Sequence, residues 1–287
     1  MSNTRTIFQL DSQPTWFENI TLRSGGTILA TRLDIPEVWE IDPEKSTGSK
    51  ILRIPFQMTS RTRHSLASVV SNLMSSRIWL ADLAGEQAKV AKIADMPEIG
   101  MVNGIATWDE NTALVTDCLY GKVYKLSVAT GSYNVTLEDN TFTIPAEAPF
   151  QVGLNGIKVY RFSEQTYVYY TTTSRFCVYR VPVTQEVQAA GSVETLAPGL
   201  VADDFALARD GTMYVCTNIS NTVVRIPATG GEAAVVAGEA KAFDVAGSTA
   251  CVFGEDEGVL YVSTSGANAV PVDGKTEPAK IVEVKLN

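Results

Sequence analysis

A short phrase recurs six times along this chain, at spacings that indicate a repeated structural unit. Each copy is an apolar run that ends in small or hydroxyl residues. The six copies are Ile28–Thr31, Ile78–Ala81, Ala113–Thr116, Val168–Thr171, Met213–Thr217 and Leu260–Thr264. Their second residues stand at 29, 79, 114, 169, 214 and 261, so the spacings are 50, 35, 55, 45 and 47 residues. A repeat of about 40–50 residues that holds several short strands is typical of a propeller blade.

The repeat predicts an all-β fold, a six-bladed β-propeller that uses residues 1–287 as a single domain. The expected blade cores are 16–57, 63–96, 101–138, 153–198, 202–238 and 242–285. Two more strand-like segments, Thr6–Leu10 and Lys280–Leu286, lie outside the repeats. Because a closed propeller leaves no open sheet edge, we expect these N- and C-terminal strands to pair in one blade. The polar stretch Glu138–Ala148 is expected to form a surface loop.

Composition narrows the range of partners. The net charge of −9 argues against nucleic acid and against anionic membrane surfaces. No apolar stretch approaches the roughly 18 residues of a spanning helix. Residues 1–5 lack the basic-then-apolar layout of a signal peptide, so a cytoplasmic location is expected, or a secreted one only if a signal was removed. The four cysteines read as small buried hydrophobic residues, namely Cys118, Cys177, Cys216 and Cys251.

The axial channel is the obvious site of a propeller, so the innermost strands matter most. These strands should begin ten to fourteen residues before each copy of the phrase. Reading back gives Glu18, Ser65 to Ser68, Asn103, Asn155, Asp204 and the neighbourhood of Cys251 to Phe253. Two of the positions belong to Asn-Gly-Ile triplets. Asn-Gly is also the commonest hairpin turn, so a turn remains an alternative there.

Three of these residues form a ligand set built only from oxygen. Glu18, Asn155 and Asp204 would suit Ca²⁺, Mg²⁺ or Mn²⁺ and would not suit copper. The plainer alternatives stay open: Glu18 as a solvated acid and Asp203-Asp204 as a strand-capping turn.

Several other chemistries are excluded. His64 is the only histidine, so a His-rich zinc site is impossible. No Gly-x-Ser-x-Gly elbow, Gly-x-Gly-x-x-Gly motif or P-loop is present. His64 stands near the start of the second blade, where it either reaches the channel mouth or lies in a surface loop.

The chain resembles the SMP-30/gluconolactonase/LRE-like family of six-bladed propellers, and most of all its fungal secondary-metabolism branch. The matching segments are Glu18–Ile20, Thr27–Thr31, Asn103–Ile105, Phe150–Ile157, Asp203–Phe205 and Asp210–Val215. The resemblance implies a divalent metal held by Glu18, Asn155 and Asp204. It also implies that Asp204 is the general base of the lactonases and that Asn103 contacts substrate.

The departures from the family are informative. Met101 stands where sugar lactonases place an Arg, and Leu119–Gly121 stands where they place a substrate-side acid. Thr171–Thr173 replaces an acid that often follows the tyrosine run of the fourth blade. A polyhydroxylated substrate would leave hydroxyls unpaired here, at roughly 1–3 kcal/mol each. We therefore expect an apolar polyketide or terpenoid substrate, contacted by Trp16, Met101, Ser68, Phe205 and Phe253.

Three functions of different kinds follow. The first is a pericyclase that needs no cofactor, because some fungal propellers similar to this chain catalyse hetero-Diels–Alder cyclisations. Its candidate catalytic residues are Asn103, Asn155, Asp204, Tyr120 and His64. The second is a lactonase or esterase that uses Ca²⁺, Mg²⁺ or Mn²⁺, in which Asp204 activates water. The third is a non-catalytic scaffold. The sequence leaves the oligomeric state open.

Overall fold

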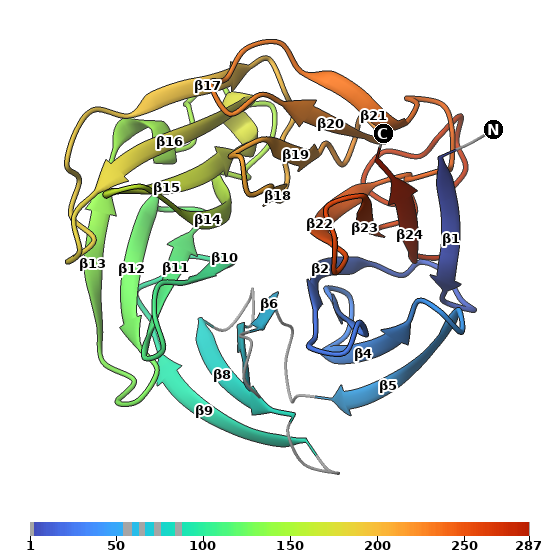
Figure 1. The fold of residues 1–287 in the computed structure, drawn as a ribbon, viewed down its shortest axis with the longest axis horizontal. Helices are drawn as coiled ribbons and strands as arrows, with labels where there is room; N and C mark the ends of the chain where they lie inside the picture. Colours follow the sequence, from blue (N-terminus) through green and yellow to red (C-terminus); the bar gives the residue numbers. More distant parts are fainter. Residues whose placement is uncertain (1–2, 54–58, 63–66, 72–75, 84–87, 287) are drawn as a thin grey trace.

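The computed structural model describes residues 3–53, 59–62, 67–71, 76–83 and 88–286, and of residues 59–62 and 67–71 only the backbone. Its strands form six four-stranded antiparallel sheets arranged in a ring (Figure 1). Five sheets are described throughout, and the sheet of β6–β9 in part. The predicted all-β propeller is confirmed, with no α-helix among the described residues. None of the helices there has the length and apolar character that crossing a bilayer demands.

The sheets follow the sequence repeat. The first sheet contains β2 (Phe17–Leu22), β3 (Ile28–Arg32), β4 (Glu37–Asp42) and β5 (Thr47–Arg53). The second contains β6 (Thr59–Thr62), β7 (Ala67–Ser71), β8 (Arg77–Asp82) and β9 (Lys89–Asp95). The third contains β10 (Val102–Thr107), β11 (Thr112–Asp117), β12 (Lys122–Ser127) and β13 (Tyr133–Glu138). The next two comprise β14 (Leu154–Phe162), β15 (Gln165–Thr172), β16 (Cys177–Val183) and β17 (Glu194–Pro198); and β18 (Phe205–Leu207), β19 (Met213–Cys216), β20 (Thr222–Ile226) and β21 (Ala234–Gly238).

The remaining sheet joins the two ends of the described chain. It contains β22 (Ser248–Phe253), β23 (Val259–Thr264), β24 (Lys280–Lys285) and β1 (Thr4–Gln9). β1 pairs antiparallel with β24, with Thr4 opposite Val284. Arg5 Nη2 lies 2.8 Å from Glu283 Oε2 across the same pairing. The predicted closure of the ring by N- and C-terminal strands is therefore confirmed.

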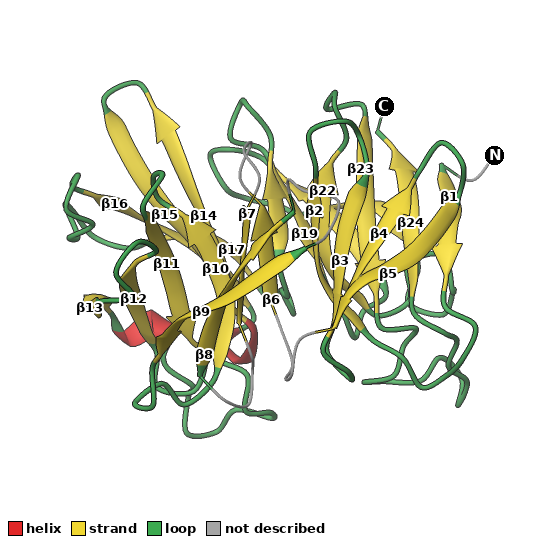
Figure 2. Ribbon diagram, turned by 90° about the horizontal axis from the view of Figure 1, so that it is seen from below, coloured by secondary structure: helices red, strands yellow, loops and turns green. Residues whose placement is uncertain are grey.

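The inner strands line the axis and contact one another in turn: β2, β6, β10, β14, β18, β22 and back to β2. Five of the six copies of the phrase form the second strand of their sheet and lie behind an inner strand (Figures 1 and 2). The copy Ile78–Ala81 differs, because it lies in β8, the third strand of its sheet. Apolar residues of the phrase are buried; Leu29, Leu114 and Val168, for example, have no exposed surface. The phrase is thus the layer on which the channel wall rests.

The hydroxyl residue of the phrase links neighbouring blades. Thr116 Oγ1 accepts a hydrogen bond from Gly104 N at 2.7 Å in its own blade and contacts Asn155 O of the next blade at 3.2 Å. Thr171 Oγ1 likewise accepts from Gly156 N at 2.9 Å and donates to Asp203 O at 2.6 Å. A side-chain hydroxyl therefore satisfies backbone groups that the strand ladder leaves unpaired.

These unpaired groups mark β-bulges in the inner strands. The register shifts between Val102 and Ile105 in β10 and between Leu154 and Ile157 in β14. Both Asn-Gly pairs lie at these bulges, so the hairpin-turn alternative is wrong. Each glycine is needed because the next blade lies close: a Cβ at Gly104 would overlap Asn155 O, and a Cβ at Gly156 would overlap Asp204 Oδ1.

Two smaller expectations can also be compared with the structure. The four cysteines are buried and free, as predicted. The segment 138–148 is not only a surface loop, because it contains the 3₁₀ helix η1 (Asn140–Phe142) and buries Phe142. The Phe142 ring packs edge-on against Tyr170 at 4.7 Å between centroids.

Candidate functional site

The described residues enclose two cavities in the axial channel, one at each end of the inner strands. Earlier residues of these strands line one cavity and later residues line the other. Glu18, Asn103 and Asn155 line the first, which we call the N-side cavity. Thr21, Ile105 and Lys158 line the second, which we call the C-side cavity.

The N-side cavity has a volume of about 590 Å³ and a mainly apolar wall. Most of the wall comes from segments that lead into inner strands or follow the second strand of a blade. The apolar lining residues are Trp16, Leu33, Met101, Phe150, Val152, Val201, Ile219, Ala269 and Val270. Phe150 packs edge-on against Phe176, with ring centroids 5.8 Å apart. Such a wall favours an apolar ligand body.

The buried side chain of Asp117 holds the backbone around Met101 in position. Asp117 Oδ2 accepts a hydrogen bond from Gly100 N at 3.1 Å, and Oδ1 accepts from Met101 N at 3.4 Å and Tyr120 N at 3.1 Å. Asp117 thereby holds two adjacent loops at the cavity mouth. Tyr120 nevertheless does not line the cavity, and 61% of its surface is exposed.

The polar groups of the N-side cavity gather where the inner strands bulge. Glu18 stands at the register shift of β2, and Asn103 and Asn155 stand at those of β10 and β14. Bulges are common beside active sites because they re-aim side chains. All three residues are at least 94% buried. Trp16 Nε1 donates to Glu18 Oε2 at 2.6 Å.

A carboxyl held by two amides completes this polar group. Asn155 Nδ2 donates to Asp203 Oδ1 at 2.8 Å, and Asn218 Nδ2 donates to Asp203 Oδ2 at 2.7 Å. Asn155 Nδ2 also donates to Thr173 Oγ1 at 3.0 Å. The amide oxygens of Asn155 and Asn218 are buried and have no hydrogen-bond partner. The two side chains that donate hydrogen bonds to the Asp203 carboxyl, Asn155 and Asn218, therefore each carry an unpaired acceptor oxygen.

The two acids of this cavity hold protons more tightly than usual. Burial, and then repulsion from Asp203, raises the pKa of Glu18 well above its ordinary value. Burial raises the pKa of Asp203 to about 7, against the opposing effect of the Asn218 and Asn155 hydrogen bonds. A carboxylic acid that stays neutral in an apolar site can donate a hydrogen bond.

The same residues fit a hard divalent cation. Ca²⁺ and Mg²⁺ prefer carboxylate and amide oxygens, and the cavity supplies two carboxyls and two unpaired amide oxygens. No cluster of three or more His, Cys, Asp or Glu suited to a metal occurs among the described residues. The set would therefore consist of Glu18 and Asp203 with amide oxygens such as that of Asn155. A bound cation would also lower the pKa of both acids.

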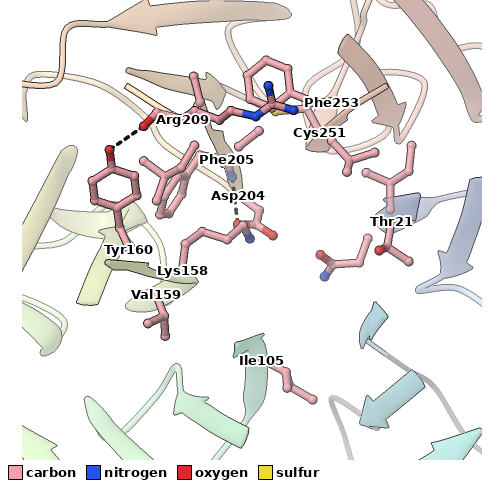
Figure 3. Close-up of a pocket in the computed structure, with 16 residues that line it drawn as sticks. Thr21, Ile105, Lys158, Val159, Tyr160, Asp204, Phe205, Arg209, Cys251 and Phe253 are labelled. Atoms are coloured by element: carbon pink, nitrogen blue, oxygen red, sulfur yellow. Dashed lines mark hydrogen bonds and ion pairs between the residues drawn. The ribbon is translucent and has the colours of Figure 1, made fainter. Parts of the chain in front are cut away.

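Asp204 differs from its predicted position. It lines the C-side cavity, of about 350 Å³, and its Oδ1 forms an ion pair with Lys158 Nζ (Figure 3). Oδ1 also accepts from Phe205 N at 2.8 Å, and the Phe205 ring lies 5.1 Å from Lys158 Nζ. The carboxyl beside Asn155 is Asp203, because adjacent residues in extended backbone point to opposite sides.

The other predicted residues divide between the two cavities. Trp16, Met101, Asn103 and Asn155 line the N-side cavity. Phe205 and Phe253 line the C-side cavity, where Tyr160 OH also donates to Arg209 O at 2.8 Å (Figure 3). His64 and the side chain of Ser68 lie outside the described residues.

Sequence reasoning missed several residues of the N-side cavity, among them Asp203, Asn218 and Phe150. Asp203 was passed over for its neighbour, and Asn218 lies in a turn rather than an inner strand. Phe150 lies in the segment before β14. The sequence did contain a signal for Phe150, because this residue belongs to Phe150–Ile157, one of the segments that resemble the family. No signal in the sequence singles out Asn218 as a site residue.

Comparison with known proteins supports the fold. No protein-family model matches the chain. A protein of Phoma sp. described as a "Putative hetero-Diels-Alderase" is 24% identical over 327 residues, covering 95% of this chain and 87% of that protein.

Two solved structures place the fold among known propellers. A calcium-binding regucalcin from Agrobacterium tumefaciens superposes with a TM-score of 0.69 at 16% identity, covering 97% of this chain and 94% of that one. A gluconolactonase from Xanthomonas campestris gives 0.70 at 14% identity, with 99% and 89% covered. The chain has the fold of SMP-30/gluconolactonase-like propellers, and the predicted resemblance is confirmed.

Proposed function

We propose that the protein is an enzyme that binds an apolar polyketide or terpenoid intermediate in the N-side cavity and catalyses a cofactor-free cyclisation of the hetero-Diels–Alder type. The observation that carries this proposal is the apolar wall above a small polar floor. The Phoma protein supports it, because its name gives this reaction type and the similarity spans most of both chains.

The chemistry asks little of the protein. In the cycloaddition one C–C and one C–O bond form together as the π bonds rearrange, and no proton or redox equivalent is exchanged. The wall would hold the two apolar partners in a reactive pose, which lowers the entropic part of the barrier. A donor that polarises the heterodiene carbonyl would lower the barrier further. We assign this role to two groups: the Glu18 carboxyl, whose raised pKa favours the protonated form, and the Asn103 amide, which makes no hydrogen bond to another described residue.

Stereochemistry tests the proposal. A reactive o-quinone methide and a terpene olefin should give one enriched diastereomer with protein in excess EDTA, and the uncatalysed mixture without it. Glu18→Gln keeps a neutral donor, so the enrichment should persist within about threefold. A diastereomer ratio that the protein does not change would eliminate the cyclase.

A second candidate is divalent-metal-dependent lactone hydrolysis. It is favoured by the two unpaired amide oxygens beside Glu18 and Asp203, and by similarity in fold to a gluconolactonase and a calcium-binding protein. Glu18, Asn155 and Asp203 would hold the cation, which would supply Lewis-acid polarisation of a carbonyl. Asp203 would accept the proton of the attacking water.

Chelation separates the two candidates. A lactonase should lose hydrolysis of an aliphatic lactone on dialysis against EDTA and regain it with CaCl₂. Glu18→Gln removes a charged ligand and should lower hydrolysis by about 100-fold. Full hydrolytic activity in EDTA would exclude this candidate and leave the cyclase untouched.

A further inference from the structure

Asn218 occupies a turn that the neighbouring blade holds in place. It lies between β19 and β20 in the left-handed region, with a φ of 39°. Its backbone N donates to Ser248 O of the next blade at 2.9 Å, and its carbonyl accepts from Asn221 N at 2.9 Å. Asn221 is fixed in turn, because its Oδ1 accepts from Gly247 N at 2.8 Å. The backbone therefore presents the Asn218 side chain from a defined position.

The side chain points into the polar floor of the N-side cavity. Its Nδ2 donates to Asp203 Oδ2, while Asn155 Nδ2 donates to the other oxygen of the same carboxyl. Since the oxygen and nitrogen of an amide are neighbours, both unpaired Oδ1 atoms lie beside Asp203. One carboxyl is thus flanked by two free acceptors that come from different blades.

Neither stability nor modification accounts for this arrangement. A buried acceptor without a partner destabilises the folded chain. Asn218-Ile219-Ser220 has the form of a glycosylation sequon, but the amide nitrogen is engaged with Asp203 and the amide oxygen is buried. An atom that is positioned and yet unpaired is expected where a ligand supplies the partner.

We propose that Asn218 is a further ligand-binding residue of this site: its Oδ1 binds a divalent cation of the Ca²⁺ type, and its Nδ2 fixes Asp203 for the same ion. This inference rests on the second proposed function. Ca²⁺ accepts six to eight oxygen ligands in irregular geometry, which suits two carboxyls and two amides that come from separate blades. The buried cation Lys158 pairs with Asp204, whereas the hydrogen bonds that the described residues make to the Asp203 carboxyl come from neutral amides.

Calorimetric titration of the EDTA-dialysed protein with CaCl₂ tests the inference. Wild type should bind one Ca²⁺, and Asn218→Ala should weaken binding by at least about tenfold. Asn218→Asp retains an oxygen at the same position and should restore binding to within about threefold. Asn134→Ala is the matched control, because Asn134 is an exposed sequon asparagine whose amide bonds only to Val135 O.

Each outcome decides between the claims. Melting temperatures without Ca²⁺ show whether each variant is folded, and Asn218→Asp keeps the test open if Asn218→Ala is not. If wild type and Asn218→Ala bind Ca²⁺ equally, the inference is overturned while metal-dependent hydrolysis stands. If wild type binds no Ca²⁺ at millimolar concentration, both fall. If Asn218→Asp binds as weakly as Asn218→Ala, the oxygen is not a ligand and the inference also fails.

Discussion

The two ends of the axial channel place two adjacent aspartates, Asp203 and Asp204, in opposite electrostatic environments. At the C-side end, Asp204 is paired with Lys158, and their side chains are only 12% and 11% exposed. At the N-side end, Asp203 is similarly buried, but among the described residues its carboxyl accepts hydrogen bonds only from neutral amides. A buried charge with a partner is a structural element, whereas a buried acid without one has a perturbed pKa and is a candidate for chemistry. This difference is the reason why the proposed function is placed at the N-side end of the channel.

Neutralising each aspartate in turn is the strongest test of the difference between Asp203 and Asp204. Asp204→Asn leaves Lys158 charged and nearly buried, so we expect a loss of about 3–5 kcal/mol in the free energy of unfolding. Turnover per folded molecule should be little changed. Urea denaturation and the activity assays described above measure the two effects.

Asp203→Asn should show the reverse pattern. One of the two amide donors loses its acceptor, at a cost of about 1 kcal/mol. Lactone hydrolysis should fall by about 100-fold or more if Asp203 is the general base, whereas cyclisation should fall far less. Equal losses of stability in the two variants would show that the ends of the channel do not differ as argued.

The glycine that separates the two ends gives the next largest effect. A Cβ at Gly156 would overlap the Asp204 carboxylate, so Gly156→Ala should destabilise the fold by about 3 kcal/mol. Gly199→Ala is the control: unlike at Gly156, a Cβ at Gly199 would have nothing within 4 Å, and its φ of 79° predicts a loss of only about 1 kcal/mol. Thermal or urea unfolding of both variants would compare them, and equal losses would remove the argument from close approach.

A pH series sharpens the comparison further. Burial raises the pKa of Glu18 and of Asp203 above the ordinary values of 4.5 and 3.8, that of Asp203 to about 7. Between about pH 4 and 7 the folded protein therefore binds more protons than the unfolded chain. Their contribution to the free energy of unfolding must fall as pH rises through this window. Asp203→Asn should flatten the fall measured by urea denaturation from pH 5 to 8; an unchanged slope would contradict it.

The smallest effect is expected outside both cavities. Tyr120 is mostly exposed and does not line the N-side cavity, so Tyr120→Phe should change the rate of either reaction by less than about twofold. Trp16→Phe, which removes the hydrogen bond to Glu18, is the contrasting variant. A large rate loss in Tyr120→Phe would place a catalytic group at the rim.

The sequence predicted the architecture better than it predicted the site. The repeated phrase located the strands because its period reflects the packing of one blade on the next. The same period could not choose between Asp203 and Asp204, which precede the short strand β18. Side-chain direction there depends on contacts with neighbouring blades, as the Thr171 hydroxyl on Asp203 O illustrates.

Asn218 and the apolar wall residues other than Trp16 and Met101 were beyond prediction for a related reason. They lie in connections between strands, whose paths depend on long-range contacts such as that of Asn218 with Ser248. Glu18, Asn103 and Asn155 were predicted because they belong to inner strands, whose position relative to the phrase is fixed.

The pairing of β1 with β24 also constrains how the chain acquires its fold during synthesis. β1 is made before β2 to β24, yet the residues that pair with it lie 271 to 280 positions further along the chain. The blades from β2 to β21 each pair locally and can form as the ribosome proceeds. The backbone N–H and C=O groups of β1 that pair with β24 therefore lack these partners until β24 has been synthesised. Chaperone demand should therefore concentrate on this first strand, and the ring should close as a single late step.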